Sequence, residues 1–234
     1  MRVLVVGEGP HDVGLRNVWC ERTARHVDHP GWLQVYIRKL ARPGEPWEIV
    51  AIQSRQIVLT GGQRRSHMPL PEGHGAKALA ARLKAEIDGF DMVIFMADAD
   101  SADDREWDRH YGWIRNGFDR IADGPAAVAC LPKCSSESWL LSDAEAWMQT
   151  GLDDPRDLPP RPEELSGHRH DPASNHPHRL FTRICRSAGV EDCRETRVEV
   201  AGRSDMDTVA RKCPKSFVAF RRDLAQSSPS GRLP

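Results

Sequence analysis

Asp91-Met-Val-Ile-Phe-Met-Ala-Asp-Ala-Asp100 is the stretch of this chain that decides the fold. Its five consecutive apolar residues, Met92 to Met96, are typical of a strand buried on both faces, the kind found in parallel sheets. Parallel sheets bind their ligands beyond the carboxyl ends of the strands. Asp98 and Asp100 therefore follow the strand at the place where we expect a functional site.

The segments on either side of this strand alternate between strand and helix patterns. Val3 to Val6 predicts a first strand, and a tight turn at Gly7 and Gly9 leads into a helical pattern from Val13 to about Arg25. Ala76 to Ile87 predicts a helix with one apolar face. This alternation predicts an α/β fold of Rossmann-like type, a parallel sheet flanked by helices. We expect the final third of the chain to form a small C-terminal helical appendage.

Further short patterns complete the expected order of elements. Before residue 70, Gly31 to Leu40 indicates a helix, Glu48 to Ile52 and Gln56 to Leu59 indicate strands, and Gly61 to Arg65 indicates a loop. After residue 100, Ser101 to Ile121 indicates an acidic loop and helix, and Ala126 to Leu131 indicates a strand. Three helical regions follow: Ser135 or Ser136 to Trp147, Leu180 to Ala188, and Asp207 to Leu224 with an interruption at Pro214.

Length and composition suit one domain with a small extension. A chain of 234 residues can bury a real core. No apolar run approaches the ~18 residues needed to cross a bilayer, the chain opens on a strand pattern rather than a secretory signal, and its six Cys contain no C-x-x-C pair. We therefore expect a reduced, cytoplasmic, soluble protein with no membrane partner. The expected divisions are a catalytic domain at 1–150, a polar surface excursion or linker at 151–178, a helical C-terminal extension at 179–226 and a disordered tail at 227–234.

Glu8, in the turn after the first strand, is the expected companion of the aspartate pair. The turn resembles the start of a G-x-G-x-x-G dinucleotide site, but Asp12 occupies the third glycine position and Glu8 would repel a pyrophosphate. Glu8, Asp98 and Asp100 instead predict a cluster of three carboxylates at the ends of two strands. Such a cluster favours a hard cation, Mg²⁺ with Mn²⁺ as a substitute, because the cation offsets the repulsion between like charges. The alternative is that Asp100 and Asp103 only cap the next helix and that Glu8 is a solvated turn residue.

Lys133 and Glu137 follow the next apolar strand and are expected at the same edge of the sheet. Lys133 is a candidate for holding a phosphate or the charge of a transition state. Glu137 is a candidate catalytic residue that would bind a second metal ion. The alternative is an ordinary helix N-terminus carrying Ser and Glu residues.

Charge is distributed unevenly along the chain, although the net charge is only −1. Residues 91 to 108 hold seven Asp or Glu and one Arg, whereas residues 201 to 234 hold seven Lys or Arg and three Asp. Arg211, Lys212 and Lys215 belong to the basic segment, and we predict that they bind a polyanionic substrate. The alternative is a solvated helix face whose Phe217 and Phe220 point into the core.

Two motifs resemble those of Toprim domains. Val3-Leu-Val-Val-Gly-Glu-Gly-Pro-His-Asp12 is similar to their first motif, a hydrophobic strand that ends in a catalytic Glu followed by Gly and a helix. Val93-Ile-Phe-Met-Ala-Asp-Ala-Asp100 is similar to their Asp-x-Asp motif. Pro132 to Asp143 and Lys212 to Phe220 resemble a family of small stand-alone Toprim-like bacterial proteins. Some members of that family are encoded beside ATPases of anti-phage defence systems and act as toxic nucleases.

The resemblance implies a Mg²⁺-dependent Toprim-type nuclease that cleaves DNA or RNA, with a role as effector of an anti-phage defence system. It implies that Glu8 is a general acid/base or metal ligand and that Asp98 and Asp100 bind Mg²⁺. The expected partners are a nucleic acid substrate, a partner ATPase and a second copy of the chain in a homodimer. Two alternatives remain open: a different Asp-x-Asp phosphotransfer enzyme, or a Toprim-like subunit that is inactive until a partner ATPase regulates it.

Overall fold

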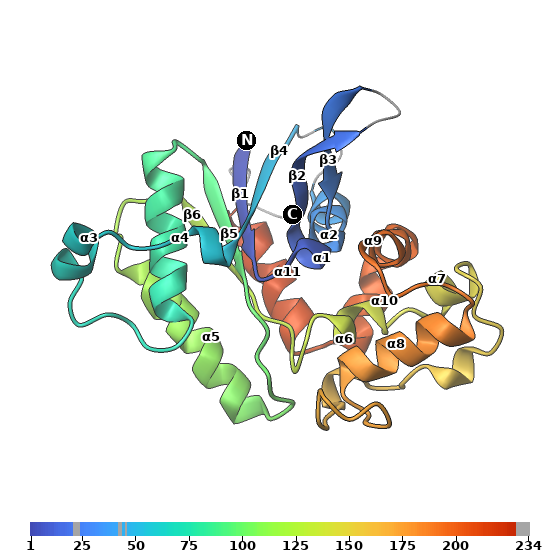
Figure 1. Ribbon diagram of the computed structural model, residues 1–234. Coiled ribbons are helices and arrows are strands. Elements are labelled where there is room, and N and C mark those ends of the chain that lie inside the picture. The colour runs from blue at the N-terminus through green and yellow to red at the C-terminus, as the bar shows by residue number, and fades with distance from the viewer. Residues whose placement is uncertain (21–23, 42–43, 45, 228–234) are drawn as a thin grey trace.

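A computed structural model describes residues 1–20, 24–41, 44 and 46–227 of the chain (Figure 1). Four parallel strands form its central sheet: β1 (Arg2–Gly7), β4 (Glu48–Gln53), β5 (Met92–Met96) and β6 (Ala126–Cys130). Their order across the sheet is β4-β1-β5-β6. The predicted α/β class with a parallel, Rossmann-like sheet is thus confirmed. The tail from residue 228 onward lies outside the described residues, and Ser227 ends a helix.

The register of the sheet places the predicted site residues side by side. Val6 of β1 pairs with Phe95 of β5, and Met96 pairs with Cys130 of β6. Glu8 follows the end of β1 and Asp98 the end of β5, so these two carboxylates leave neighbouring strands at one edge of the sheet. The segment beginning at Leu131 leaves the third strand at the same edge.

Helices cover both faces of the sheet, because alternate strand residues point to opposite sides. Val3, Val5 and Ile94 belong to a core that also contains Trp32 and Phe217. The helices on this face are α2 (Trp32–Leu40), α9 (Arg194–Arg203) and α11 (Ser216–Ser227). Residues on the other side of β1 and β5 pack with α4 (Gly75–Ile87) and α5 (Asp104–Asp119). The C-terminal helices are therefore built into one face of the sheet and differ from the small appendage that was expected.

The other elements lie around the sheet and its covering helices, and several of them lie at the carboxyl edge of the sheet. They are α1 (Pro10–Val13), the antiparallel pair β2 (Gly14–Cys20) and β3 (Arg25–Pro30), α3 (Gly61–Ser66), α6 (Glu137–Leu140), α7 (Ala144–Met148), α8 (Pro177–Ser187), α10 (Met206–Lys212) and 3-10 turns at Ser54–Gln56, Pro155–Asp157 and Pro162–Glu164. No helix of the described segments is both long and apolar enough to cross a membrane.

The segment after α1 contradicts its predicted helix. A strand pair replaces the helix expected from Val13 to Arg25, although residues 21–23 lie outside the described chain. The helix ends at Val13 because Gly14 adopts φ 87°, and a Cβ there would lie 2.2 Å from the carbonyl oxygen of His29. The helical spacing of Leu15 and Val18 is therefore accidental.

Three further expectations were wrong. Gln56 to Leu59 begins in a 3-10 turn and forms no strand. Gly61 to Arg65 is helical rather than a loop, because Thr60 and Gln63 form a reciprocal capping box. The helix expected to run to Trp147 is split into α6 and α7, and Asp143 caps the second with its Oδ1 atom 3.0 Å from the amide of Glu145. The pattern also missed α9, whereas the expected helices near 31–40, 76–87 and 180–188 are confirmed.

Helices α4 and α5 approach each other closely at Gly117, which makes this glycine a test of the packing. A Cβ on Gly117 would lie 2.1 Å from the carbonyl oxygen of Gly75, whereas one on Gly112 of the same helix would meet nothing within 4 Å. Gly117→Ala should lower the free energy of unfolding by about 1–3 kcal/mol through overpacking. Gly112→Ala should raise it by up to about 1 kcal/mol, because alanine favours exposed helix positions over glycine. Urea unfolding of both variants would contradict the close approach if the two changes had the same sign.

Candidate functional site

A cleft of about 470 Å³ opens at the carboxyl edge of the sheet. Its lining comes from four parts of the chain: the turn after β1 with α1, the end of β5, the start of α6, and the segment from the polar excursion to α9. The lining residues are Glu8, Gly9, His11, Asp12, Asp98, Ser135, Ser136, Glu137, Arg169, His178, Asp192 and Arg197. Three of the predicted site residues, Glu8, Asp98 and Glu137, therefore share one opening.

Asp98 has the most unusual environment in this cleft. Its Oδ1 atom is shielded from solvent and receives no hydrogen bond from any described residue. Burial raises the pKa of Asp98 well above its ordinary value, and the negative charges of Glu137, Asp12, Glu8 and Asp100 raise it further, in that order. These carboxylates are therefore close enough to repel one another.

Asp12 joins this group although sequence reasoning used it only to exclude a dinucleotide site. Its Oδ1 atom accepts hydrogen bonds from Trp32 Nε1 at 2.8 Å and from Ser136 Oγ at 3.3 Å. Burial raises the pKa of Asp12, against the lowering effect of the Trp32 hydrogen bond. The sequence signal that could have identified Asp12 as a site residue is its position, because an acid stands there in place of the third glycine of a G-x-G-x-x-G motif.

Asp100 lies beside the cleft rather than in its lining. It is exposed and adopts φ 52°, and Cys134 opposite it adopts φ 58°. The amide of Asp100 donates a hydrogen bond of 3.0 Å to the carbonyl oxygen of Cys134, so two residues in the left-handed region face each other. Such conformations cost about 1–3 kcal/mol each and cluster at functional sites.

The carboxylates of this cleft have the chemistry of a divalent-cation site but not yet its geometry. Within the described ranges, no set of three or more His, Cys, Asp or Glu side chains is already placed to hold one ion. The expected convergence of Glu8, Asp98 and Asp100 on a single position is therefore not present, and Asp100 is the member outside the cleft. The donor chemistry nevertheless fits, because Asp98 offers an unpartnered carboxylate oxygen amid repelling acids, and a hard cation binds such oxygens.

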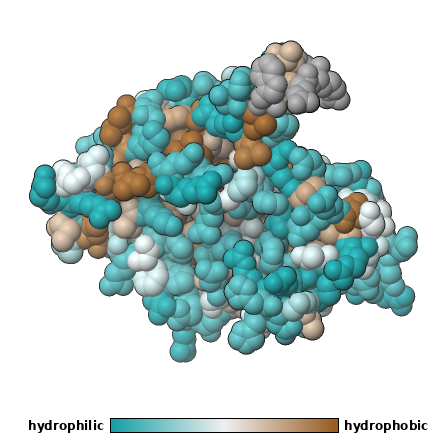
Figure 2. All heavy atoms as spheres, in the orientation of Figure 1, coloured by the Kyte–Doolittle hydropathy of each residue, from teal (hydrophilic) through white to brown (hydrophobic). Residues whose placement is uncertain are grey.

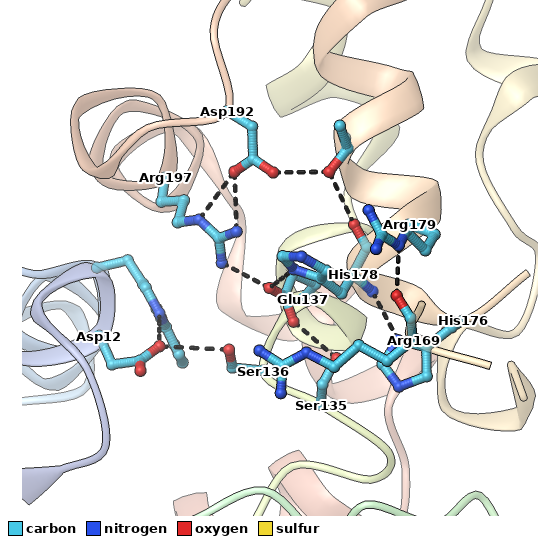
Figure 3. Close-up of polar contacts among 12 residues, drawn as sticks. Asp12, Ser135, Ser136, Glu137, Arg169, His176, His178, Arg179, Asp192 and Arg197 are labelled. Carbon is cyan, nitrogen blue, oxygen red and sulfur yellow. Dashed lines mark hydrogen bonds and ion pairs between the residues drawn. The ribbon is translucent and has the colours of Figure 1, made fainter. Parts of the chain in front are cut away.

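Glu137 is held in a dense network of hydrogen bonds (Figure 3). Its Oε1 atom lies 2.8 Å from Arg197 Nη1 and 2.9 Å from His178 Nδ1, and its Oε2 atom accepts a 2.6 Å hydrogen bond from Ser135. Burial raises the pKa of Glu137, but the His178 hydrogen bond and the charge of Arg197 outweigh it and leave the pKa well below its ordinary value. Glu137 is therefore a fixed negative charge, and that charge is the strongest of those acting on Asp98.

Arg197 connects Glu137 to the C-terminal helices. Its side chain is only 5% exposed and also binds Asp192, with Nη2 2.8 Å from Oδ1. Asp192 in turn accepts a 2.8 Å hydrogen bond from Thr182 of α8, and the Arg197 guanidinium lies 4.5 Å from the ring centroid of Phe181. Sequence reasoning missed Arg197 and Asp192, because nothing near them in the chain marks a residue that binds Glu137 at a separation of 60 positions.

Lys133 is placed away from the acidic cleft. Its side chain is 6% exposed, and its Nζ atom lies 2.6 Å from Oδ1 of Asp104 at the start of α5. It lines a second cleft of about 510 Å³ with four other cations, Arg161, Arg211, Lys212 and Lys215. The acids Asp104, Glu163 and Glu164 line the same cleft, which we call the basic cleft because its cations outnumber its acids by five to three. The predicted substrate-binding residues thus gather around Lys133, whereas Lys133 and Glu137 line different clefts.

The two clefts share one connecting loop, the segment from Lys133 to Ser135 that follows β6. Lys133 lines the basic cleft and Ser135 lines the acidic one. The amide of Cys134 donates a 2.8 Å hydrogen bond to the carbonyl oxygen of Ser101, which ties this loop to the segment after β5. Figure 2 shows that the lower part of this face of the molecule is mostly hydrophilic. One short loop therefore joins the cations of the second cleft to the carboxylates of the first.

The site thus combines repelling carboxylates at the ends of parallel strands with a neighbouring group of cations, an arrangement suited to a metal ion and a phosphate-bearing ligand. No family model matches the chain, and neither the curated proteins nor the solved structures match it.

Proposed function

We propose that this protein is a Mg²⁺-dependent nuclease of Toprim type that cleaves phosphodiester bonds in DNA or RNA. The observation that carries the proposal is the unpartnered carboxylate oxygen of Asp98, set among the charges of Glu8, Asp12 and Glu137 at the ends of neighbouring strands. The order of the Glu turn and the Asp-x-Asp strand in the sequence supports the same reading.

Glu8 and Asp98 would hold the metal ion in this proposal, with Asp100 beside them and Mn²⁺ as a substitute. A bound Mg²⁺ supplies Lewis-acid stabilisation of the attacking and leaving oxygens. Glu8, which is exposed in the turn after β1, is the carboxylate best placed to exchange a proton with substrate or water. Glu137, ionised and fixed by Arg197, adds the negative charge that makes a cation favourable at Asp98.

The basic cleft would bind the flanking sugar-phosphate backbone. Arg211 and Lys212 make hydrogen bonds to Thr208 and to the Pro160 carbonyl, and no described acid pairs with them. Lys215 and Lys133 bind the exposed carboxylates of Asp108 and Asp104. The Lys215–Asp108 pair is partly exposed and contributes little, so a phosphate can replace its carboxylate. Lys133 is itself only 6% exposed, so a phosphate would reach its ammonium group by replacing the exposed carboxylate of Asp104. The role of Lys133 is then to bind substrate rather than to act on the scissile bond.

The proposal is tested by incubating the protein with Mg²⁺ or Mn²⁺ and a mixed pool of plasmid, single-stranded DNA and transfer RNA. We expect cleavage of at least one nucleic acid, its loss in EDTA, and its loss in both Glu8→Ala and Asp98→Ala. Cleavage that survives Asp98→Ala would refute the site.

Two other results of the same assay would favour the alternatives. If Glu8→Ala is silent while Asp98→Ala inactivates, a different Asp-x-Asp phosphotransfer enzyme is favoured. If cleavage appears only when a partner ATPase is added, the conditionally active subunit is favoured. The proposed role as an anti-phage effector rests on the sequence resemblance alone and is tested by phage challenge of cells that express the chain.

A further inference from the structure

Arg169, in the polar excursion between α7 and α8, is the cation of the acidic cleft that is left available for a ligand. The cleft lining contains two arginines, Arg169 and Arg197. The guanidinium of Arg197 is engaged by Glu137 and Asp192. No described residue accepts a hydrogen bond from the guanidinium of Arg169 or forms an ion pair with it, and the residue is exposed. The two arginines therefore differ in role: one is fixed inside the protein, and the other has an unengaged head group.

The backbone that carries Arg169 is nevertheless fastened to α8. Arg179 donates a hydrogen bond to the carbonyl oxygen of Arg169 itself. Arg183 donates to the carbonyl oxygens of Pro172 at 3.0 Å and Ser174 at 2.7 Å. Because α8 also supplies His178 to Glu137, the same helix positions the excursion and the carboxylate relative to each other. Arg169 thus reaches the cleft from an anchored segment.

Figure 3 shows the Arg169 side chain extending from the excursion toward the side of the cleft formed by Ser135 and Ser136. The rest of the lining is dominated by acids, which would repel an approaching anion. A guanidinium binds a phosphate with two parallel hydrogen bonds, a geometry that an ammonium group does not reproduce. An unengaged arginine at the rim of an acidic cleft therefore supplies the attraction that an anionic substrate needs there.

We infer that Arg169 binds a backbone phosphate of the nucleic acid at the acidic cleft and holds the scissile bond against the carboxylates of Glu8 and Asp98. This inference rests on the proposed nuclease function and assigns a role to the excursion that its sequence pattern did not indicate. It identifies Arg169 as a substrate-binding residue distinct from the cations of the basic cleft.

The test compares Arg169→Ala, Arg169→Lys and the control Arg156→Ala. Arg156 lies in the same excursion, is 89% exposed, and bonds only Asp154 among the described residues. The probes are fluorescein-labelled single-stranded DNA and RNA oligonucleotides, with binding measured by anisotropy in Ca²⁺ and cleavage measured in Mg²⁺.

Arg169→Ala should weaken binding and lower kcat/KM by about 10- to 100-fold, the loss expected for a charge-assisted hydrogen bond. It should also reduce the slope of log Kd against log salt by about 1. Arg169→Lys should fall between Arg169→Ala and the wild type, and Arg156→Ala should match the wild type. The melting temperatures should all agree, because the Arg169 guanidinium has no partner among the residues that the structure describes.

The failures of the two proposals are distinguishable in this design. If the wild type cleaves and Arg169→Ala binds and cleaves as Arg156→Ala does, the role of Arg169 is overturned and the nuclease function stands. If the wild type neither binds nor cleaves any probe, the proposed function fails and the inference fails with it. A drop in melting temperature that accounts for the lost binding would also overturn the inference, since it would indicate a structural role.

Discussion

Asp98→Asn should produce a protein that is more stable than the wild type in EDTA and inactive as a nuclease. The wild-type carboxylate is held among four other acids and has one shielded oxygen without a partner. Removing its charge relieves that repulsion, and we expect a gain of about 0.5–2 kcal/mol in the free energy of unfolding, as is common when a strained functional residue is replaced. Cleavage should fall by about 100-fold or more, the usual effect of deleting one transition-state-stabilising group.

The stability gain should depend on pH in a defined direction. The pKa of Asp98 is raised in the folded state above its ordinary value of 3.8, so the folded protein retains this proton to higher pH than the unfolded chain does. The stabilising contribution is complete below pH 3.8 and is lost as pH rises through the folded pKa. Urea unfolding in EDTA across this range should show the gap between Asp98→Asn and wild type widening as pH rises. A constant gap would contradict the raised pKa.

Magnesium should reverse the order of the two proteins. A cation that binds the folded state alone stabilises it by mass action, so the melting temperature of the wild type should rise with Mg²⁺ concentration. Asp98→Asn should respond weakly, because it lacks the charge that favours a cation. Equal responses of both proteins would place any bound Mg²⁺ elsewhere, and no response of the wild type would reject a metal site at this cluster.

Arg197→Met should be among the most destabilising single changes in the chain. Arg197 and Glu137 are 5% and 7% exposed, so removing the arginine leaves a buried carboxylate without its main counter-charge. Breaking a buried ion pair from one side costs about 3–5 kcal/mol. Asp192 loses its ion-pair partner at the same time and, among the described residues, keeps only its hydrogen bond from Thr182.

A double variant separates the cost of breaking the Arg197–Glu137 ion pair from the cost of losing the packing of the arginine side chain. Glu137→Gln combined with Arg197→Met removes both charges, and it should be more stable than Arg197→Met alone because no unpaired Glu137 carboxylate remains. Arg156→Ala, which breaks an exposed ion pair, serves as the matched control and should leave the free energy of unfolding almost unchanged. Urea unfolding measures all three, and the network is refuted if Arg197→Met costs no more than Arg156→Ala.

The β2–β3 strand pair and the end of α6 are two places where the local sequence pattern failed to predict the secondary structure. Leu15 and Val18 have helical spacing, yet they lie in a strand, because Gly14 adopts φ 87° against the carbonyl of His29. Asp143 interrupts a helical pattern because its Oδ2 atom also accepts a 2.7 Å hydrogen bond from the amide of Asp205, far along the chain. Both outcomes depend on contacts between distant residues, which periodicity does not record.

The apolar strand patterns were sufficient to predict a parallel sheet and to place Glu8 and Asp98 at its carboxyl edge. A strand buried on both faces must be apolar throughout, so β5 can be predicted from its own residues without knowing which strands lie beside it. Polar residues that follow such strands must lie at the carboxyl edge of the sheet. Which charges pair became clear only in the folded protein, where Arg197 binds Glu137 and Lys133 binds Asp104. The folded protein likewise showed that the Arg169 guanidinium has no partner among the described residues. The physical reason is that an ion pair depends on where two side chains end up in space, and charged residues look alike in sequence whether they are paired, buried or exposed.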